Sequence, residues 1–212
     1  MAQLRATESS SAKLAYGFAG FVAAGSLLLL PFSVTPFLRA RLPYQHTPAD
    51  KLKAGFAIIK RHRDKHRKGA RALQNPRFVD LGSGAGEATI MAAQRGYHAL
   101  GVEINPTLLL ISQINKVWQF GVLSRGGPSH CKFRCANLLS LDYSKFDVLF
   151  MFGVKPLLKI VEPKLVNTDQ NTLLMLYRFK LPPAGRLLGE GFFERVGNEG
   201  ELTLYERTSK IE

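Results

Sequence analysis

The sequence predicts an α/β fold: a mostly parallel, Rossmann-like sheet with helices on both faces, preceded by one N-terminal transmembrane helix. Three observations support this prediction. Short apolar segments alternate with helix-like segments from residue 77 onward, a pattern typical of parallel sheets covered by helices. A glycine-rich loop follows the first apolar segment, at residues 82–86. A run without any charged side chain lies ahead of both, at residues 14–38.

The uncharged run at residues 14–38 is long enough to cross a bilayer, because a transmembrane helix needs about 20 apolar residues. Pro31 and Pro36 lie near its end, so its best helical part is residues 14–30. The run is too long for the apolar region of a signal peptide. Its Ala, Gly and Leu residues lie all round a helix, which disfavours a helix with one buried face. We therefore expect a single anchor in the lipid bilayer at residues 14–38.

Basic residues are concentrated on the C-terminal side of this run. Arg39, Arg41 and the basic cluster at residues 60–68 follow the run, whereas only Arg5 and Lys13 precede it. Positive residues favour the cytoplasm-like side of a membrane. We therefore expect the folded domain on that side. We divide the chain into an N-terminal tail (1–13), the anchor (14–38), a segment with a helix and a basic loop (39–76) and the α/β domain (77–212).

The elements of the fold follow from apolar periodicity and from capping residues. Thr47 with Pro48 marks one helix start, and Asn105 with Pro106 marks another. A turn at residues 197–200 predicts a closing hairpin. The expected helices span residues 47–63, 86–95, 105–120 and 155–165, the last with Pro163 inside, which would kink or shorten it. The expected strands span residues 77–81, 98–103, 131–135, 146–152, 171–177, 192–196 and 202–207.

The composition suits one domain with a sizeable core, since 46% of the 212 residues are hydrophobic. The formal charge of +13 indicates nucleic acid, an anionic membrane, an acidic partner or simply a solvated basic surface. The only cysteines, Cys131 and Cys135, indicate a thiol-reducing compartment. Their spacing without a second pair does not favour zinc, so we expect no metal and predict that both thiols pack in the core.

The loop after the first predicted strand indicates the kind of cofactor. Ligands of open α/β sheets bind at the carboxyl ends of the strands, and glycines let the backbone approach them. A dinucleotide fingerprint, G-x-G-x-x-G, requires a glycine where the chain has Glu87 or Thr89. The observed spacing is D-x-G-x-G-x-G, which resembles motif I of methyltransferases that use S-adenosylmethionine. It comprises Asp80, Gly82, Ser83, Gly84, Ala85 and Gly86.

Glu103 stands at the tip of the second predicted strand, at about the distance from Asp80 at which an acidic residue contacts a ribose. A carboxylate accepts two hydrogen bonds in a fork, which suits the vicinal ribose hydroxyls. The alternative is a helix-start anion beside the Asn105 cap. Strand, loop, helix and second strand occur in the required order, so we assign Glu103 to the ribose.

Two further segments can be compared with seven-strand methyltransferases: the one after the third predicted strand resembles them, and the one after the fourth lacks a motif that some of them carry. In that class a polar residue after the third strand meets the adenine amine, and here Asn137 and Leu138 stand at that place. The alternative for Asn137 is a plain turn residue. Enzymes that methylate base amines usually carry an Asn/Asp-Pro-Pro-aromatic motif after the fourth strand, and the sequence from Phe152 to Pro156 lacks it. This disfavours methylation of nucleic-acid bases.

The wider pattern resembles the small family of membrane-anchored mitochondrial protein-lysine methyltransferases, whose members modify the ATP synthase c-subunit or the adenine nucleotide translocase. The resemblance covers residues 14–196. Besides the anchor, it rests on the segments PYQHTP (43–48), VDLGSG (79–84), GVEINP (101–106), FGV (152–154), KL (164–165), RF (178–179) with Pro182, and GEG (189–191).

The resemblance implies the seven-strand class and S-adenosyl-L-methionine as cofactor. It also implies that Tyr44 and Thr47 fold over the methionine end of the cofactor. Their alternatives are an aromatic at the membrane interface for Tyr44 and a helix cap for Thr47. The expected cofactor-binding residues are Tyr44, Thr47, Asp80, Gly82, Ser83, Gly84, Gly86, Glu103, Asn105, Asn137 and Leu138.

The chain departs from the family pattern at Ala85, Glu87, Thr107 and the pair Leu204–Tyr205. The first three departures bear on cofactor affinity and the last bears on the substrate.

No dedicated base is required, because burial lowers the pKa of a lysine from its usual value of about 10.4. The candidate catalytic residues are Tyr44 and Phe152, and His46 is the nearest candidate base.

We therefore expect an S-adenosylmethionine-dependent protein-lysine methyltransferase of the mitochondrial inner membrane, with its catalytic domain in the matrix. Its partner would be a membrane-embedded protein that carries the target lysine. An RNA methyltransferase is the first alternative, given the basic cluster at residues 60–68, but that cluster lacks the aromatics that stack bases, so nucleic acid is not expected. A non-catalytic membrane adaptor is the second alternative, given Ala85 and Glu87.

Overall fold

The computed structural model describes residues 46–66, 75–121, 130–153 and 155–208, together with Tyr16 and Gly20. The chain divides into two compact units, Met1–Pro43 and Tyr44–Glu212, and the fold below is that of the second. Among the described residues, no helix is long and apolar enough to cross a membrane. The predicted anchor at 14–38 lies almost entirely outside these residues, as do Tyr44 and the basic stretch after residue 66, so those predictions remain predictions.

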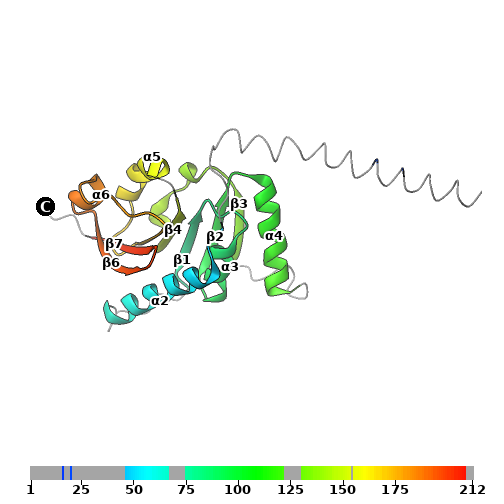
Figure 1. Cartoon of the computed structure of the whole chain (residues 1–212), viewed down its shortest axis with the longest axis horizontal. Helices are drawn as coiled ribbons and strands as arrows, with labels where there is room; N and C mark the ends of the chain where they lie inside the picture. Colours follow the sequence, from blue (N-terminus) through cyan, green and yellow to red (C-terminus); the bar gives the residue numbers. More distant parts are fainter. Residues whose placement is uncertain are drawn as a thin grey trace, which may run out of the picture. The chain divides into compact units, whose positions relative to one another are not determined.

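Seven strands form one sheet in the order β3-β2-β1-β4-β5-β7-β6 (Figure 1). The first five strands are parallel, and β7 pairs antiparallel with both β5 and β6. This confirms the predicted mixed sheet. The strands are β1 (Arg77–Leu81), β2 (His98–Glu103), β3 (Cys131–Cys135), β4 (Val148–Phe152), β5 (Leu173–Tyr177), β6 (Phe193–Glu199) and β7 (Leu202–Arg207).

Helices cover both faces of this sheet, as predicted. Helices α2 (Ala49–His66) and α3 (Glu87–Gln94) pack on one face, with α4 (Pro106–Phe120) beside them along β3. Helices α5 (Lys155–Val166) and α6 (Arg186–Gly189) pack on the other face. Because the chain runs outward from β1 to β3 and then returns to β4, the strand order reverses between β1 and β4. Ligands of open α/β sheets bind at this reversal.

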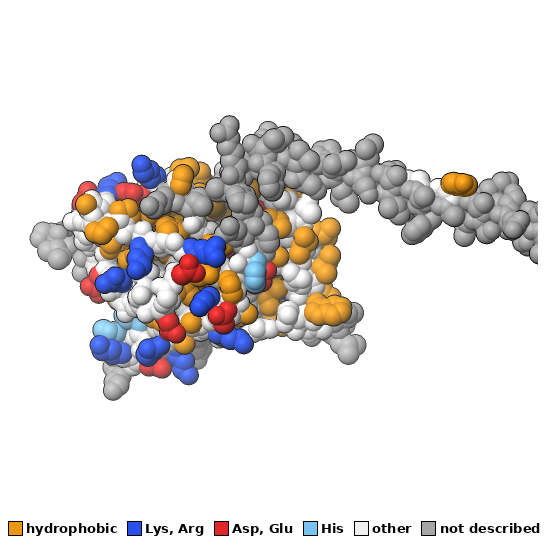
Figure 2. All heavy atoms as spheres, in the orientation of Figure 1, with side chains coloured by type: hydrophobic (Ala, Val, Ile, Leu, Met, Phe, Trp, Pro, Cys, Tyr) orange, Lys and Arg blue, Asp and Glu red, His pale blue; other side chains and the backbone are white. Residues whose placement is uncertain are grey.

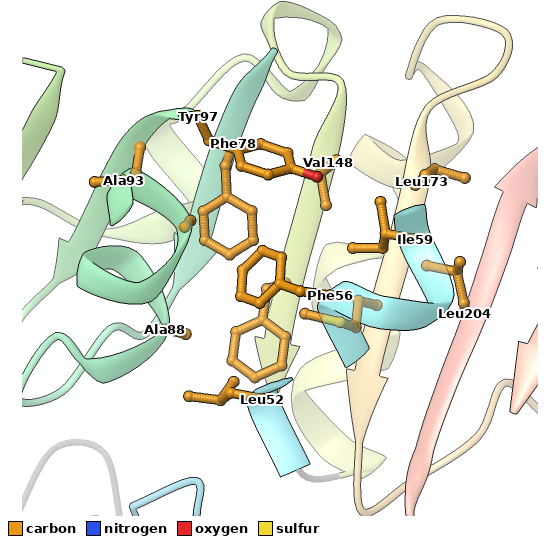
Figure 3. Packing of buried hydrophobic residues seen from close by; sticks show 14 of the residues in the cluster. Leu52, Phe56, Ile59, Phe78, Ala88, Ala93, Tyr97, Val148, Leu173 and Leu204 are labelled. Carbon is orange, nitrogen blue, oxygen red and sulfur yellow. The ribbon is translucent and has the colours of Figure 1, made fainter. Parts of the chain in front are cut away.

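Helix α2 contributes an apolar face to the core through Leu52, Phe56 and Ile59, which follow the helical period (Figure 3). The ring of Phe56 packs against those of Phe78 and Tyr97, with centroids 5.6 and 5.7 Å away, and these two rings also contact each other at 6.0 Å. Tilted aromatic pairs at this separation are stabilising beyond the area they bury. The helix that precedes the cofactor loop in sequence is therefore fixed to β1, the strand that carries Asp80.

The predicted hairpin turn at residues 197–200 is wrong by several residues. Strand β6 continues to Glu199, and the turn consists of Gly200 and Glu201. A register shift between Arg195 and Gly197 lets the strand continue. The side chain of Ile58 packs where a Cβ on Gly197 would stand. That glycine therefore serves the close approach of α2 and not a turn.

Other boundaries differ less. Helix α5 keeps its full length despite Pro163, helix α2 continues to His66, and β4 and β5 begin two residues later than predicted. The short helix α6 was not predicted. Both thiols were expected in the core, but only Cys131 is buried, and Cys135 is exposed at the end of the edge strand β3. Among the described residues, no group of His, Cys, Asp and Glu could hold a metal ion.

Candidate functional site

The glycine loop lies at the carboxyl end of β1, next to the strand reversal. Gly82, Gly84 and Gly86 all have positive φ, at 86°, 53° and 90°, a conformation that residues with a Cβ rarely adopt. The backbone amides of Gly82 and Ser83 donate to the carbonyl of Val102 at 2.9 and 3.0 Å, which ties the loop to β2. The loop therefore has a fixed shape and presents little but backbone to a ligand.

Gly86 has a second requirement besides its φ angle. A Cβ at this position would stand 2.6 Å from the ring of Phe133 and 2.9 Å from the Cβ of Ser112. Gly86 is also the N-cap of α3, and its carbonyl accepts the amide of Ile90 at 2.9 Å. The third glycine of the motif thus allows α3, α4 and β3 to meet at one point.

Asp80 is buried at the end of β1, with 3% of its surface exposed. Its Oδ2 accepts the hydroxyl of Thr89, 3.0 Å away. Burial, with a smaller contribution from the nearby Glu87 and Glu103 carboxylates, raises the pKa of this carboxyl to about 7, although the Thr89 hydroxyl opposes the shift. A cationic ligand group beside Asp80 would favour its ionised form.

Glu103 holds the two sides of the site together. The amide of Gly84 donates to its Oε2 and the amide of Asn105 donates to its Oε1, both at 2.9 Å. Each carboxylate oxygen accepts more than one hydrogen bond, so both oxygens keep a lone pair for a ligand. The predicted ribose contact and the alternative of a helix-start anion are therefore compatible.

A small pocket opens beside Asp80 at this end of the sheet. The hydroxyl of Ser83 is buried there and has no hydrogen-bond partner among the described residues. Buried polar groups are nearly always partnered, so Ser83 has an unused donor and acceptor for a polar ligand end. This fits the carboxylate and ammonium of a methionine moiety. The pocket is lined by Thr47, Asp80, Gly82, Ser83, Glu87, Ala88, Phe150 and Phe152.

The asparagines of the predicted site act as caps. Asn105 accepts the amide of Thr107 through its side chain at 2.9 Å and starts α4. Asn137 accepts the amide of Leu139 at 2.9 Å and starts a short 3-10 helix, Leu138–Ser140. Asn137 is exposed, and its side-chain oxygen keeps a second lone pair. The cap explains its residue type without a ligand and leaves an adenine contact sterically open.

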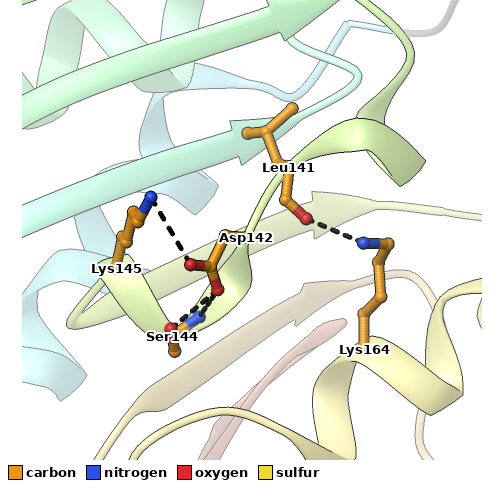
Figure 4. A network of polar contacts seen from close by, with 5 residues as sticks. All are labelled: Leu141, Asp142, Ser144, Lys145 and Lys164. Carbon is orange, nitrogen blue, oxygen red and sulfur yellow. Dashed lines mark hydrogen bonds and ion pairs between the residues drawn. The ribbon is translucent and has the colours of Figure 1, made fainter.

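Lys164 of α5 fixes the segment that follows Asn137. Its ammonium donates to the carbonyl of Leu141 at 2.8 Å and lies 5.6 Å from the centre of the Tyr143 ring. Nearby, Asp142 accepts the amide and hydroxyl of Ser144, at 3.2 and 2.7 Å (Figure 4). The structure thus gives the Lys-Leu element of the family pattern a positioning role.

The structure separates the candidate catalytic residues. Phe152 lines the pocket and packs on Tyr177, with ring centroids 5.1 Å apart. His46 lies outside that lining, and its Nδ1 is 3.8 Å from a carboxylate oxygen of Glu87. Tyr44 lies outside the described residues. The pocket therefore has an aromatic wall, and Thr47, just before α2, also lines it.

The role of Thr89 was not predicted from the sequence. There, Thr89 served only to show that a dinucleotide fingerprint lacks its third glycine. It is fully buried on α3 and holds Asp80. The signal was a hydroxyl in the otherwise apolar stretch Ala88 to Ala93, on the helix that follows the loop.

The model of the family described as ANTKMT methyltransferase domain matches residues 80–185, half of the chain. The chain is 27% identical over 169 residues to an ATP synthase c-subunit lysine N-methyltransferase of Caenorhabditis elegans, which covers 78% of this chain and 82% of the relative. It is 27% identical over 180 residues to the enzyme of that name from Mus musculus, which covers 82% of this chain and 66% of the relative.

Solved structures share the fold at low sequence identity. A magnesium protoporphyrin IX methyltransferase from Synechocystis with bound S-adenosylmethionine has a TM-score of 0.54 and 17% identity, covering 86% of this chain and 96% of that one. An RNA methyltransferase from Salinibacter ruber with S-adenosyl-L-homocysteine has a TM-score of 0.50 and 22% identity, covering 79% and 95%. The predicted methyltransferase class and the seven-strand fold of the domain are confirmed, and the cofactor in these structures is the predicted one or its demethylated product.

Proposed function

This chain belongs to the ANTKMT methyltransferase domain family, and from that premise we propose that it is an S-adenosylmethionine-dependent protein-lysine N-methyltransferase acting on the ATP synthase c-subunit. The proposed substrate rests on one observation: the curated relatives from Caenorhabditis elegans and Mus musculus are both named for methylation of the c-subunit. The adenine nucleotide translocase is the second candidate substrate, from the resemblance described above. As the resemblance implies, either substrate would be embedded in the mitochondrial inner membrane, so one mode of access would serve both.

Three groups would hold the cofactor. Glu103 accepts the two ribose hydroxyls while it keeps its bonds to the Gly84 and Asn105 amides. The unpartnered Ser83 hydroxyl meets the carboxylate of the methionine end. The buried Asp80 carboxyl attracts the ammonium. When bound, the cofactor supplies an electrophilic methyl group.

The chain's own residues then have to present a neutral lysine and exclude water. A lysine side chain that enters beside Phe150 and Phe152 leaves water for an aromatic wall. Desolvation lowers the pKa of its ammonium, so the proton can be lost to solvent as the amine leaves the water. Alignment of the amine with the methyl group supplies the rest of the rate enhancement. Phe152 thus shapes the channel and does not transfer a proton.

We also propose that residues 14–38 anchor the enzyme in the mitochondrial inner membrane with the folded domain in the matrix. The support is the uncharged run and the excess of basic residues after it. Tethering raises the effective concentration of an enzyme beside a membrane-embedded substrate. An enzyme held there needs only modest intrinsic affinity for the substrate.

The test is to incubate the purified full chain with methyl-labelled cofactor and inner-membrane extract, with total RNA in a parallel reaction. We expect label on a small membrane protein, and mass spectrometry should place it on a lysine. Label on RNA alone would overturn the proposal. Calorimetry on the same sample separates the remaining alternative, since a chain that bound no cofactor would be an adaptor and not an enzyme.

A further inference from the structure

Helix α4 presents large apolar side chains to the outside of the molecule. Leu110, Ile111, Ile114 and Trp118 have 58%, 39%, 56% and 84% of their surface exposed. Their spacing places them in one stripe along the helix. Figure 2 shows hydrophobic side chains gathered along this edge of the molecule. Contiguous exposed apolar stripes of this kind mark interaction surfaces, whereas scattered exposed residues do not.

The opposite side of α4 carries the residues that a helix normally turns outward. Ser112 is the buried residue of this helix, and its hydroxyl bonds back to the carbonyl of Leu109 at 2.7 Å. Asn115 donates to the carbonyl of Ala85 at 3.0 Å. A helix on a water-exposed surface buries its apolar residues. Helix α4 thus buries polar residues and exposes apolar ones, although Phe120 at its end also packs against the core. Its outer face is therefore suited to an apolar medium.

The charge around α4 identifies that medium. In the sequence, no Asp or Glu occurs from residue 104 to residue 141, while Lys116, Lys132 and Arg134 lie in the described part of that stretch. Lys132 and Arg134 are exposed on β3, the edge strand beside α4. A second copy of the chain would bring the same positive surface against this one, which is unfavourable. An anionic bilayer attracts basic residues and takes up the apolar stripe.

We propose that the outer face of α4 lies in the interfacial layer of an anionic lipid bilayer, with Trp118 at the depth where tryptophans gather in membrane proteins. This inference rests on the membrane placement under Proposed function. It adds a second contact with the bilayer, separate from the anchor. Two contacts fix the orientation of the domain, whereas one anchor leaves the domain free to turn.

Trp118 is the only tryptophan of the chain, so the native protein carries its own probe. The full chain is reconstituted into vesicles of phosphatidylcholine and phosphatidylglycerol, at a low and a high protein-to-lipid ratio. Its fluorescence is then quenched either by acrylamide in the water or by lipids brominated along their acyl chains. We expect strong quenching by the brominated lipids, weak quenching by acrylamide, and the same result at both ratios.

A paired substitution tests the stripe itself. Leu110→Ser with Ile114→Ser should reduce quenching by brominated lipid severalfold and expose Trp118 to acrylamide. The control is Ile160→Ser, which removes an equally exposed apolar side chain (54%) from α5 on the other face of the sheet and should change neither signal. Both variants change exposed positions, and methylation of detergent-solubilised substrate should confirm that they fold.

Three results would overturn the proposal. Trp118 quenched by acrylamide and not by brominated lipid would show that α4 faces water. Shielding from acrylamide that grows with protein density, without quenching by lipid, would show a contact between copies. A chain that vesicles did not retain at all would refute this proposal and the membrane placement together, whereas retention without lipid quenching would refute only the role of α4.

Discussion

At the scale of single residues, Asp80 makes the site sensitive to pH. Burial raises its pKa from 3.8 to about 7. Between these two values the folded chain keeps a proton that the unfolded chain loses. The stability that protonated Asp80 contributes is therefore fully present below about pH 4 and is lost as the pH rises to and through about 7. The shift sets an upper limit of about 4 kcal/mol for this effect.

We expect the free energy of unfolding of the cofactor-free chain, measured with urea in detergent, to fall from about pH 4 to about pH 7 and to level off above that. Asp80→Asn keeps an acceptor for Thr89 and should remove part of this slope. Equal slopes in the parent and the variant would contradict the raised pKa. Cofactor affinity should follow the opposite direction and rise over the same range, because a cationic ligand favours the ionised carboxyl.

Glu103 allows a sharper test of cofactor binding. Glu103→Gln replaces one acceptor oxygen by an amide group that would face the backbone donors of Gly84 or Asn105. Hydrogen bonds to charged groups contribute about 1.5–3 kcal/mol, so we expect cofactor affinity by calorimetry to fall by about tenfold or more. Glu194→Gln, at an exposed carboxylate on β6, is the control. If Glu103→Gln left the affinity at the parent's value, the ribose assignment would be wrong.

At the scale of elements, the junction of α3, α4 and β3 depends on Gly86. Gly86→Ala introduces a Cβ at a φ of 90°, 2.6 Å from the Phe133 ring. Gly96→Ala meets a similar φ of 82° but open space, so it isolates the cost of backbone strain, about 1 kcal/mol. We expect Gly86→Ala to destabilise the chain by a further ~1–3 kcal/mol in urea unfolding. Equal losses for the two variants would show that the junction tolerates a methyl group.

Most elements could be predicted because their signals are local. Strands β1, β2 and β3 agree with prediction to the residue, since each is a short run bounded by a loop or by a turn residue. The closing hairpin was predicted, but its turn could not be placed, because Gly197 has the residue type of a turn and instead allows the close approach of the distant Ile58 of α2. The predicted burial of Cys135 was wrong for a similar reason. Its exposure depends on the position of β3 at the edge of the sheet, which the local sequence does not reveal.

The site was predictable to a similar degree. The motif residues Asp80 and Glu103 were found from spacing, because parallel strands bring successive loops to one edge of the sheet. Thr89 was not, because its role depends on a hydrogen bond across the turn from β1 to α3. The cap bonds of Asn105 and Asn137 are local, but only the first was foreseen. A role such as that of Thr89 depends on which residues are close in three dimensions, and such contacts leave no regular spacing in the sequence.

At the scale of the whole molecule, the uncharged run at residues 14–38 predicts that the chain is an integral membrane protein. The full chain should stay in the pellet when inner membranes are washed with alkaline carbonate. The double variant Val22→Asp with Leu27→Asp should be released into the supernatant, because each aspartate costs about 2.5–3.5 kcal/mol in a membrane helix. The matched control places isoleucine at the same two positions. A parent chain found in the supernatant would contradict the anchor.

The folded domain is proposed to transfer methyl groups from S-adenosylmethionine to a lysine of the ATP synthase c-subunit. The most direct test combines purified full chain, S-adenosylmethionine and reconstituted c-subunit, with Glu103→Gln in parallel, and maps modified residues by mass spectrometry. We expect methylation of one lysine of the c-subunit by the parent and much slower methylation by the variant. An unmodified c-subunit in the presence of a chain that binds the cofactor would contradict the substrate, and equal activity of the two proteins would contradict the site.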